Sequence, residues 1–331
     1  MKKFIKNIVC MFIPFGKLRR KVRAKLLNSP YEIRIGGRKK IINQIRNLPD
    51  PIAAYRELCK NLDNESAITA SRSLAIIDAS PTKLEEIITP HELQEFRANM
   101  TILTHGIFKI KNGCYAFGRD MLPINYFEYS VFCTHHGMDA IDLSKIPADS
   151  VVIDVGGFIG DSALIFRRYL KNKIYSFEPF AGNYSLMQKT IEMNDIGDQV
   201  IPVRLALTEN PNAKVFSVEK STGSTLTITD ASSGDELPSD TLDNFARQNG
   251  LKVGLVKVDI EGAEQLFLRG GKATIERDKP TMLLSIYHIK SDLDYFNIKK
   301  MIESWNLGYK FRIFKPMDNN ILGETLLICE Q

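Results

Sequence analysis

Long hydrophobic runs and paired cysteines are both missing from this sequence. The apolar run in the N-terminal segment, from Ile8 to Phe15, is far shorter than the roughly 20 residues that span a bilayer, and no small-residue cleavage site follows it. The five cysteines are odd in number, scattered and without metal-ligand spacing. These absences disfavour a membrane-spanning anchor, a disulfide framework and a cysteine-based zinc site. They predict reduced thiols in a cytoplasmic protein.

The basic excess of the chain is confined to its N-terminal end. The formal net charge is +5 over 331 residues, but residues 1–40 hold 13 Lys and Arg against one acid. That segment therefore carries +12 and leaves −7 for the rest. Hydrophobic content of 44% and charged content of 25% are typical of a globular protein with one large domain or two smaller ones.

Residues 1–27 form a basic segment with apolar side chains at helical spacing, interrupted at Pro14. We interpret it as an amphipathic segment on an anionic membrane surface, peripheral to the inner face, where each nearby Lys or Arg contributes about 1 kcal/mol. A solvated tail or a helix packed on the body is the alternative. Nucleic acid is not expected as a partner, because the body is acidic and no recognition motif follows.

Residues 28–147 form a helical and β extension of the next domain. Prolines separate its helical patterns, and short β-like runs flank Asn112-Gly113, a hairpin signal. The aromatic-rich run 121–137 follows and ends near His135 and His136. We interpret this run as a possible substrate lid. Two adjacent histidines on a strand would face opposite sides, which argues against a shared metal ion.

From residue 148 to 331 the pattern alternates between strand and helix, which predicts an α/β fold with a doubly wound, mostly parallel seven-stranded sheet. Residues 212–237, rich in Ser, Thr, Gly and Asp, interrupt the alternation and predict a hairpin and loop. The expected strands are 151–155, 173–178, 200–207, 254–259, 281–287, 309–314 and 324–330. The expected helices are 161–170, 182–194, 239–249, 262–277 and 292–306.

The stretch from Val151 to Phe166 predicts a buried strand, a glycine turn and the start of a helix. The turn contains Gly156, Gly157 and Gly160. Glycines there let the backbone approach a ligand at a helix N-terminus, although an ordinary strand-to-helix connection has the same pattern. A dinucleotide fingerprint would need glycine at position 155, which is Val155, and this disfavours NAD.

The next strand ends at Glu178, and an acid at this point can accept both ribose hydroxyls of a nucleoside. A later stretch, LVKVDIEGAEQLFLRGG, contains Lys257, Asp259, Glu261 and Glu264. Together with DVGGFIGDSA, YSFEP and TLDNF, it resembles the FkbM-type family of S-adenosylmethionine (SAM)-dependent methyltransferases. The resemblance covers roughly residues 150–331. It implies a Rossmann-like sheet with an antiparallel seventh strand, and O-methylation of a sugar or polyketide hydroxyl.

The resemblance also implies a set of cofactor-binding residues. Asp154 and the backbone of Gly156 and Gly157 are expected to face the methionine part of SAM, within the turn that Gly160 completes. Glu178 is expected to bind the ribose. Adenine is expected near Pro179 and Ala206, with Phe177 and Leu207 beside it and Glu209 as a weak candidate for its amine. Phe158 replaces a glycine that many methyltransferases have, and would narrow the turn.

The chemistry requires a group that helps remove the proton of an acceptor hydroxyl. Asp259 and Glu261 follow a strand two residues apart, at the edge where open α/β sheets bind ligands. Asp259 is our first candidate for a general base or substrate anchor. His288, with an ordinary pKa near 6.5, is a second candidate base or a structural histidine. For Glu264, stabilisation by the helix dipole is the favoured interpretation.

Asp259, Glu261 and His288 together offer ligand atoms for a divalent ion such as Mg²⁺, but their spacing matches no metal motif. The sequence therefore predicts no metal ligand.

The sequence favours a SAM-dependent O-methyltransferase of polysaccharide biosynthesis, acting on a sugar hydroxyl of a cell-surface glycan or its precursor. The alternative is a membrane-associated scaffold of the same fold that binds SAM without turnover.

Overall fold

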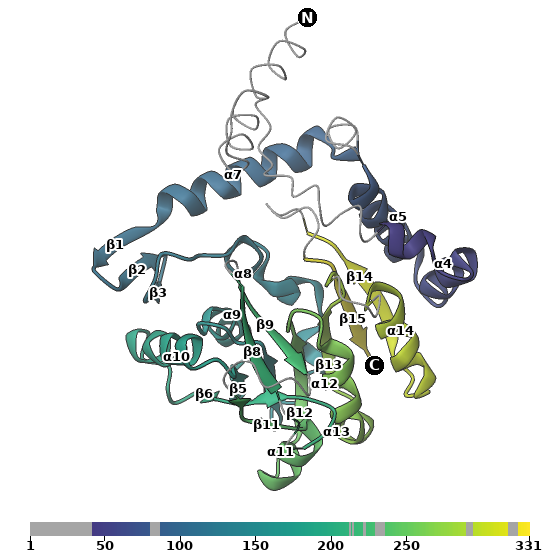
Figure 1. Ribbon diagram of the computed structural model, residues 1–331. Helices are drawn as coiled ribbons and strands as arrows, with labels where there is room; N and C mark the ends of the chain where they lie inside the picture. Colours follow the sequence, from purple (N-terminus) through teal and green to yellow (C-terminus); the bar gives the residue numbers. More distant parts are fainter. Residues whose placement is uncertain are drawn as a thin grey trace, which may run out of the picture.

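The computed structural model describes residues 42–79, 87–211, 213, 215–220, 223–228, 236–288, 294–316 and 324–331. The predicted basic segment 1–27 lies outside these residues. Figure 1 shows a central sheet with helices on both sides and an N-terminal group of helices at its upper end.

Seven strands form the central sheet, in the spatial order β14-β15-β13-β12-β4-β5-β6. All are parallel except β15, which runs antiparallel to both of its neighbours. The predicted doubly wound, mostly parallel sheet with an antiparallel seventh strand is confirmed. The strands are β4 (Val151–Val155), β5 (Ile174–Phe177), β6 (Val200–Val203), β12 (Val253–Val258), β13 (Thr281–Ser285), β14 (Lys310–Phe314) and β15 (Leu326–Glu330).

Successive residues of the central strands are buried on opposite faces of the sheet. On β4, Val152 belongs to one hydrophobic cluster and Ile153 to the other, as the period of two along a strand requires. The first face packs against α9 (Asp161–Tyr169) and α10 (Ala181–Met193). The second packs against α11 (Leu242–Gln248), α12 (Glu264–Gly270), α13 (Lys272–Asp278) and α14 (Asp294–Ser304).

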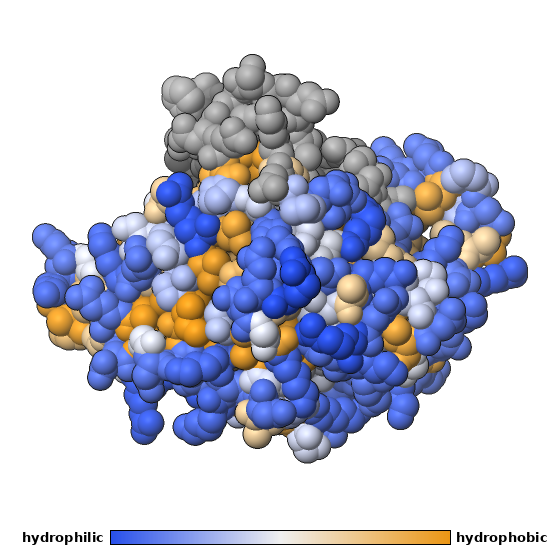
Figure 2. Space-filling model, turned by 90° about the horizontal axis from the view of Figure 1, so that it is seen from below, coloured by the Kyte–Doolittle hydropathy of each residue, from blue (hydrophilic) through white to orange (hydrophobic). Residues whose placement is uncertain are grey.

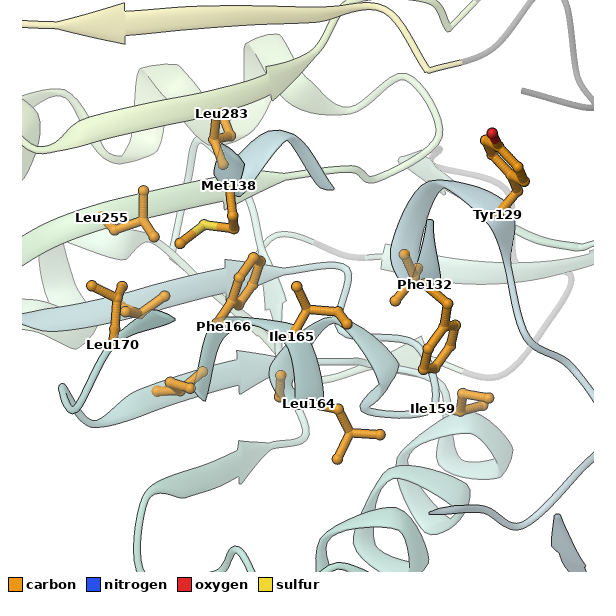
Figure 3. Packing of buried hydrophobic residues seen from close by; sticks show 14 of the residues in the cluster. Tyr129, Phe132, Met138, Ile159, Leu164, Ile165, Phe166, Leu170, Leu255 and Leu283 are labelled. Carbon is orange, nitrogen blue, oxygen red and sulfur yellow. The ribbon is translucent and has the colours of Figure 1, made fainter. Parts of the chain in front are cut away.

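The first face also buries segments that precede the sheet in sequence. Phe132 of α8 (Tyr129–Phe132) and Met138 of the short 3₁₀ segment η1 (His135–Ala140) are buried with Phe166 of α9 and Leu255 of β12, as Figure 3 shows. A second 3₁₀ segment, η2 (Leu143–Lys145), leads to β4. The end of the extension is therefore packed into the core of the α/β domain.

Two predicted elements are divided in the structure. The strand expected at 200–207 ends at Val203, and β7 (Ala206–Leu207) pairs instead with β11 (Ser239–Asp240) in a separate two-stranded sheet. The helix expected at 262–277 is broken between α12 and α13. A Cβ on Gly270 would lie 1.9 Å from the Thr208 carbonyl oxygen, so the backbones approach too closely for any side chain there.

Among the described residues, the longer helices of the extension are α4 (Pro51–Cys59), α5 (Asn64–Asp78) and α7 (Pro90–Gly106). In Figure 1, α4 and α5 lie beside β14 and α14, and α7 crosses above the sheet. Leu58 of α4 is buried with the second face of the sheet. The helical patterns predicted between the prolines of this extension are confirmed for α4, α5 and α7.

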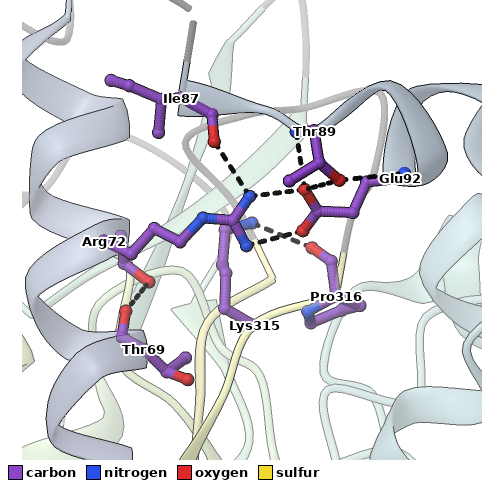
Figure 4. A network of polar contacts seen from close by, with 8 residues as sticks. Thr69, Arg72, Ile87, Thr89, Glu92, Lys315 and Pro316 are labelled. Atoms are coloured by element: carbon purple, nitrogen blue, oxygen red, sulfur yellow. Dashed lines mark hydrogen bonds and ion pairs between the residues drawn. The ribbon is translucent and has the colours of Figure 1, made fainter.

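One polar network joins α5 to the start of α7 (Figure 4). Both terminal nitrogens of Arg72 donate to Glu92 at 2.6 Å, and one also donates to the Ile87 carbonyl oxygen. Glu92 completes a capping box with Thr89. The bonds from Arg72 lower the pKa of Glu92 to about 2. This network fixes where α7 begins.

The hairpin predicted around Asn112-Gly113 is confirmed: β1 (Phe108–Lys111) pairs antiparallel with β2 (Cys114–Phe117), and β3 (Asp120–Leu122) adds a third strand. In the region 212–237, β8 (Val215–Lys220) and β9 (Gly223–Ile228) form the expected hairpin, with β10 (Glu236–Leu237) beside it. Part of this region lies outside the described residues.

The two adjacent histidines are not on a strand, so this part of the prediction is wrong. His135 and His136 have φ values of 48° and 50°, in the left-handed region. His135 contacts Asp139 and Tyr169, whereas His136 is buried with its ring 6.3 Å from that of Phe166. Burial lowers the pKa of His136 to about 4.

Hydrophilic residues cover most of the face drawn in Figure 2, with hydrophobic residues exposed between them. None of the helices in the described ranges has the length and apolar character that crossing a membrane requires.

Candidate functional site

The glycine turn after β4 lies against the residues that follow β12. Gly156 has a φ of 81°, and a Cβ there would lie 2.0 Å from the Asp259 carbonyl oxygen. A Cβ on Gly157 would lie 2.0 Å from the Ser176 hydroxyl oxygen. Only glycine allows the backbone to pass this close to two neighbouring strands. The turn thereby brings the ends of β4, β5 and β12 together.

The N–H groups of the three glycines in this turn already donate to carbonyl oxygens of the protein. Gly156 and Gly157 both donate to the Phe177 carbonyl oxygen, at 3.1 and 2.9 Å, and Gly160 donates to the Gly157 carbonyl oxygen at 2.7 Å. Gly156 and Gly157 would therefore let a ligand lie close to the backbone, but their N–H groups are not free to donate to it. Gly160, with a φ of 84°, is the residue before α9.

The carboxylate of Asp154 lies beneath the turn and is fully buried. It accepts hydrogen bonds from the hydroxyls of Ser162 and Ser176, both at 2.7 Å, and lies 3.3 Å from the Lys257 ammonium. Lys257 also donates to the Gly156 carbonyl oxygen at 2.8 Å. Asp154 thus holds the turn in place from below.

Asp161, the first residue of α9, is a charged residue that sequence reasoning did not select. It is 3% exposed, and its Oδ2 atom makes no hydrogen bond with any described residue. Burial raises the pKa of Asp161 to about 6. A buried carboxylate oxygen without a partner at a helix start is unusual, and it suits a cationic group of a ligand.

Glu178 follows β5 and is 4% exposed. Its Oε1 accepts the Phe180 N–H at 2.9 Å, and burial raises its pKa to about 7. Pro179 is next in the chain, and Ala206 of β7 packs with Phe180 in a small hydrophobic cluster. The structure therefore brings three predicted cofactor residues close together.

The expected adenine surroundings are present in part. The Phe177 ring packs edge-on against Phe245 of α11, with 4.9 Å between centroids. Glu209 is ion-paired with Arg269 at 2.5 Å. Its carboxylate is therefore engaged with another side chain.

An acidic and histidine cluster lies at the ends of β12 and β13. His288 Nδ1 is 2.8 Å from Glu264 Oε1, and His288 Nε2 is 3.3 Å from Asp259 Oδ1. Burial alone would lower the pKa of His288, but the charge of Glu264 outweighs it and raises the pKa to about 10. His288 with this proton bound cannot accept another at neutral pH, so the prediction of an unperturbed histidine base is wrong.

Asp259 is the partly exposed member of this cluster, with 21% of its side chain accessible. Burial opposes its ionisation, but the positive charges of His288 and Lys257 outweigh burial and hold its pKa below the ordinary value. Tyr287 donates its hydroxyl to Asp259 Oδ1 at 3.2 Å. Asp259 is therefore an ionised hydrogen-bond acceptor that is partly accessible to solvent.

Glu261 is placed differently from the prediction. β12 ends at Val258, so the alternation of a strand does not extend to Glu261, whose φ is 56°. Its side chain is 66% exposed, with Oε2 3.9 Å from His288 Nε2. Glu264 instead is fully buried and lies closer to His288.

The comparisons with known proteins agree with this architecture. Residues 154–311 match the model of the methyltransferase FkbM domain. The chain is 30% identical over 152 residues to Methyltransferase 1 of Beauveria bassiana (strain ARSEF 2860), a match that covers 39% of this chain and 61% of that protein. The crystal structure of Methyltransferase FkbM from Methylobacillus flagellatus KT superposes with a TM-score of 0.54 at 18% identity. This superposition covers 87% of this chain and 60% of that one.

The family model thus matches just under half of the chain, and over residues 154–311 the chain is similar to FkbM methyltransferase domains. The chain spans about three-fifths of the length of each of these two proteins. The matched residues include every site residue predicted from the sequence, from Asp154 to His288.

The sequence alone did not reveal the roles of two side chains, Asp161 and Glu264. Asp161 lies in the motif DVGGFIGDSA, but only its burial in the structure distinguishes it from an ordinary acid in the first turn of a helix. Glu264 fits the dipole explanation locally, because it begins α12. Its contact with His288 joins residues 24 positions apart, and no local pattern reports such a contact.

Proposed function

We propose that this chain is a SAM-dependent O-methyltransferase. The observation that carries this proposal is the meeting of two groups at the carboxyl ends of neighbouring strands: Glu178 with the glycine turn, and Asp259 with Tyr287. Open α/β sheets bind ligands at this edge. The match of residues 154–311 to the methyltransferase FkbM domain supports the same conclusion.

SAM fits the residues on one side of this edge. Glu178, buried at the end of β5, would accept the two ribose hydroxyls. Asp161 Oδ2, buried without a hydrogen bond from the described residues, would accept the ammonium of the methionine part. Phe177 and Ala206 would contact adenine. The glycines allow the cofactor to lie against the backbone.

When bound, SAM supplies a methyl group on a positively charged sulfonium. Asp259, ionised at neutral pH, would accept a hydrogen bond from the acceptor hydroxyl and take its proton as the methyl group is transferred to the hydroxyl oxygen. The products are a methyl ether and S-adenosylhomocysteine. Tyr287 holds the Asp259 carboxylate in place.

A sugar hydroxyl of a cell-surface glycan or its precursor is the acceptor we propose. Carboxylates and exposed aromatic rings suit polyhydroxylated ligands, and Tyr126, 46% exposed, packs against Phe158 of the glycine turn at 5.5 Å. Tyr126 belongs to the predicted lid run, which would cover the acceptor from this side.

Methyl transfer tests this proposal. The wild type, incubated with SAM labelled in its methyl group, is expected to label lipid-linked or extracted glycans in a base-stable form. Asp259→Asn should lower the rate about 100-fold or more and change affinity for S-adenosylhomocysteine by less than threefold. Asp198→Asn, on an exposed loop, is the matched control. Cofactor binding without labelled glycan would instead support the scaffold alternative.

We also propose that residues 1–27 hold the enzyme on an anionic membrane. Their basic charge supports this, and lipid-linked acceptors would be found there. The full chain should float with vesicles that contain phosphatidylglycerol, but not with neutral vesicles, and deletion of residues 1–27 should abolish flotation. Equal flotation with and without this segment would refute the proposal.

A further inference from the structure

Three ionisable side chains of the site converge beside the proposed acceptor position. Asp259, Glu264 and His288 each offer one ligand atom, and these atoms all lie within 4.8 Å of one another. Glu264 is fully buried, and the His288 side chain is 6% exposed. With respect to the described residues, Asp259 is the member of this cluster that solvent reaches.

The buried atoms of this cluster lack the hydrogen bonds that such groups normally make. Among the described residues, neither ring nitrogen of His288 finds a partner in hydrogen-bond geometry, although carboxylate oxygens lie 2.8 and 3.3 Å away. Glu264 Oε1 accepts the Ile260 N–H at 2.9 Å, but Oε2 has no partner. Nearly all buried polar atoms in proteins are hydrogen-bonded, so these orphaned atoms need an explanation.

A metal ion bound through one ring nitrogen of His288 would satisfy that nitrogen together with one oxygen of each carboxylate. Ligand atoms about 2.0–2.2 Å from one ion lie about 3 Å apart when they are adjacent, close to the 2.8 Å between His288 Nδ1 and Glu264 Oε1. Electrostatics favours the same conclusion, because two carboxylates meet at one imidazole in a buried place.

We propose that Asp259, Glu264 and His288 bind a divalent metal ion. Imidazole with two carboxylates suits Mn²⁺ or Zn²⁺ better than Mg²⁺ or Ca²⁺, which prefer oxygen ligands alone. This ligand set differs from the one that the sequence suggested, because Glu264 replaces the exposed Glu261. The partly exposed side of Asp259 leaves room for a further ligand.

The role of the ion rests on the proposed function. An acceptor hydroxyl bound to it would lose its proton more readily, since a metal ion lowers the pKa of a coordinated oxygen. The binding of the ion itself does not depend on the acceptor or on SAM, so the two proposals can fail separately.

Metal titration of the full chain tests the site. After treatment with EDTA and buffer exchange, Mn²⁺ and Zn²⁺ are titrated separately by calorimetry, and bound Mn²⁺ is counted by electron paramagnetic resonance. The wild type is expected to bind one equivalent of at least one of these ions. Glu264→Gln and Asp259→Asn should each weaken binding at least tenfold. Glu261→Gln is the matched control and should change affinity less than threefold.

Affinity for S-adenosylhomocysteine, measured without metal, shows whether each variant is folded. Since Asp259 is partly exposed, its variant should fold even if the change at buried Glu264 does not permit folding. The proposal is overturned if the wild type binds neither ion stoichiometrically. It is also overturned if the folded ligand variants bind metal as tightly as the wild type, or if Glu261→Gln loses metal affinity. If S-adenosylhomocysteine binds but no metal does, only the metal site is refuted. Metal binding without S-adenosylhomocysteine binding would refute the proposed function instead.

Discussion

Affinity for S-adenosylhomocysteine should fall as the pH decreases from 8 to 6. Burial raises the pKa of Glu178 to about 7, and ribose hydroxyls would donate to its ionised form. Only about a tenth of Glu178 is ionised at pH 6, against about nine tenths at pH 8, which lowers affinity about tenfold. Asp161, with a pKa of about 6, is half protonated at pH 6 and adds about a factor of two.

The sign follows from linkage. A ligand that requires the ionised carboxylate lowers its pKa on binding, so protons are released and binding weakens as the pH falls through the pKa of the unbound form. The wild type is therefore expected to lose about 20-fold in affinity between pH 8 and pH 6. In Glu178→Gln the tenfold change caused by Glu178 is absent. Affinity should then fall only about twofold between pH 8 and pH 6, because of Asp161 alone.

Calorimetry at pH 6, 7 and 8, in two buffers with different ionisation enthalpies, measures both the affinity and the protons released. Glu276→Gln, on α13 and ion-paired with Lys272, is the matched control and should behave as the wild type. If Glu178→Gln keeps the wild-type pH dependence, or if binding of the wild type is independent of pH, the assignment of Glu178 to the ribose is refuted.

Two further predictions concern the stability of the fold, measured by urea unfolding. Gly156→Ala should lower the free energy of unfolding by about 3 kcal/mol or more, because the new Cβ would clash with the Asp259 carbonyl oxygen at a φ of 81°. Gly250→Ala, at a φ of 61° with no atom near its Cβ, should lower it by only about 1 kcal/mol. Equal losses in the two variants would contradict the close approach of Gly156 to Asp259. Glu92→Gln should cost about 1–2 kcal/mol at pH 7, after allowance for the partial exposure of Arg72. Because Arg72 depresses the pKa of Glu92, the wild type should lose this contribution to stability as the pH falls from about 4.5 towards 2. If Glu92→Gln is as stable as the wild type at pH 7, the network does not stabilise the fold.

The sheet could be predicted from the sequence because its strands are short apolar runs separated by turn residues. Val152 and Ile153 are both apolar since each faces a different covered side, as buried parallel strands require. The end of β6 and the break before α13 could not be predicted. Each depends on contacts between distant segments, such as the approach of Gly270 to Thr208.

The location of a site residue could be predicted where it follows directly from a strand of the sheet. Its protonation state and hydrogen bonds could not, because they depend on residues far away in the sequence. Glu178 and Asp259 follow strands, and their place at the sheet edge is fixed by the topology. The protonation of His288 depends on Glu264, which reaches it only in the folded chain. The Gly156 and Gly157 N–H groups donate to the Phe177 carbonyl oxygen. This contact joins the ends of two strands, so it too could not be predicted from local sequence.

Calorimetric titration of the purified protein with S-adenosylhomocysteine measures directly whether the chain binds the cofactor through Glu178. One binding site is expected in the wild type, with at least tenfold weaker binding in Glu178→Ala, a difference of about 1.4 kcal/mol or more. No binding by the wild type, or equal binding by the variant, would contradict it.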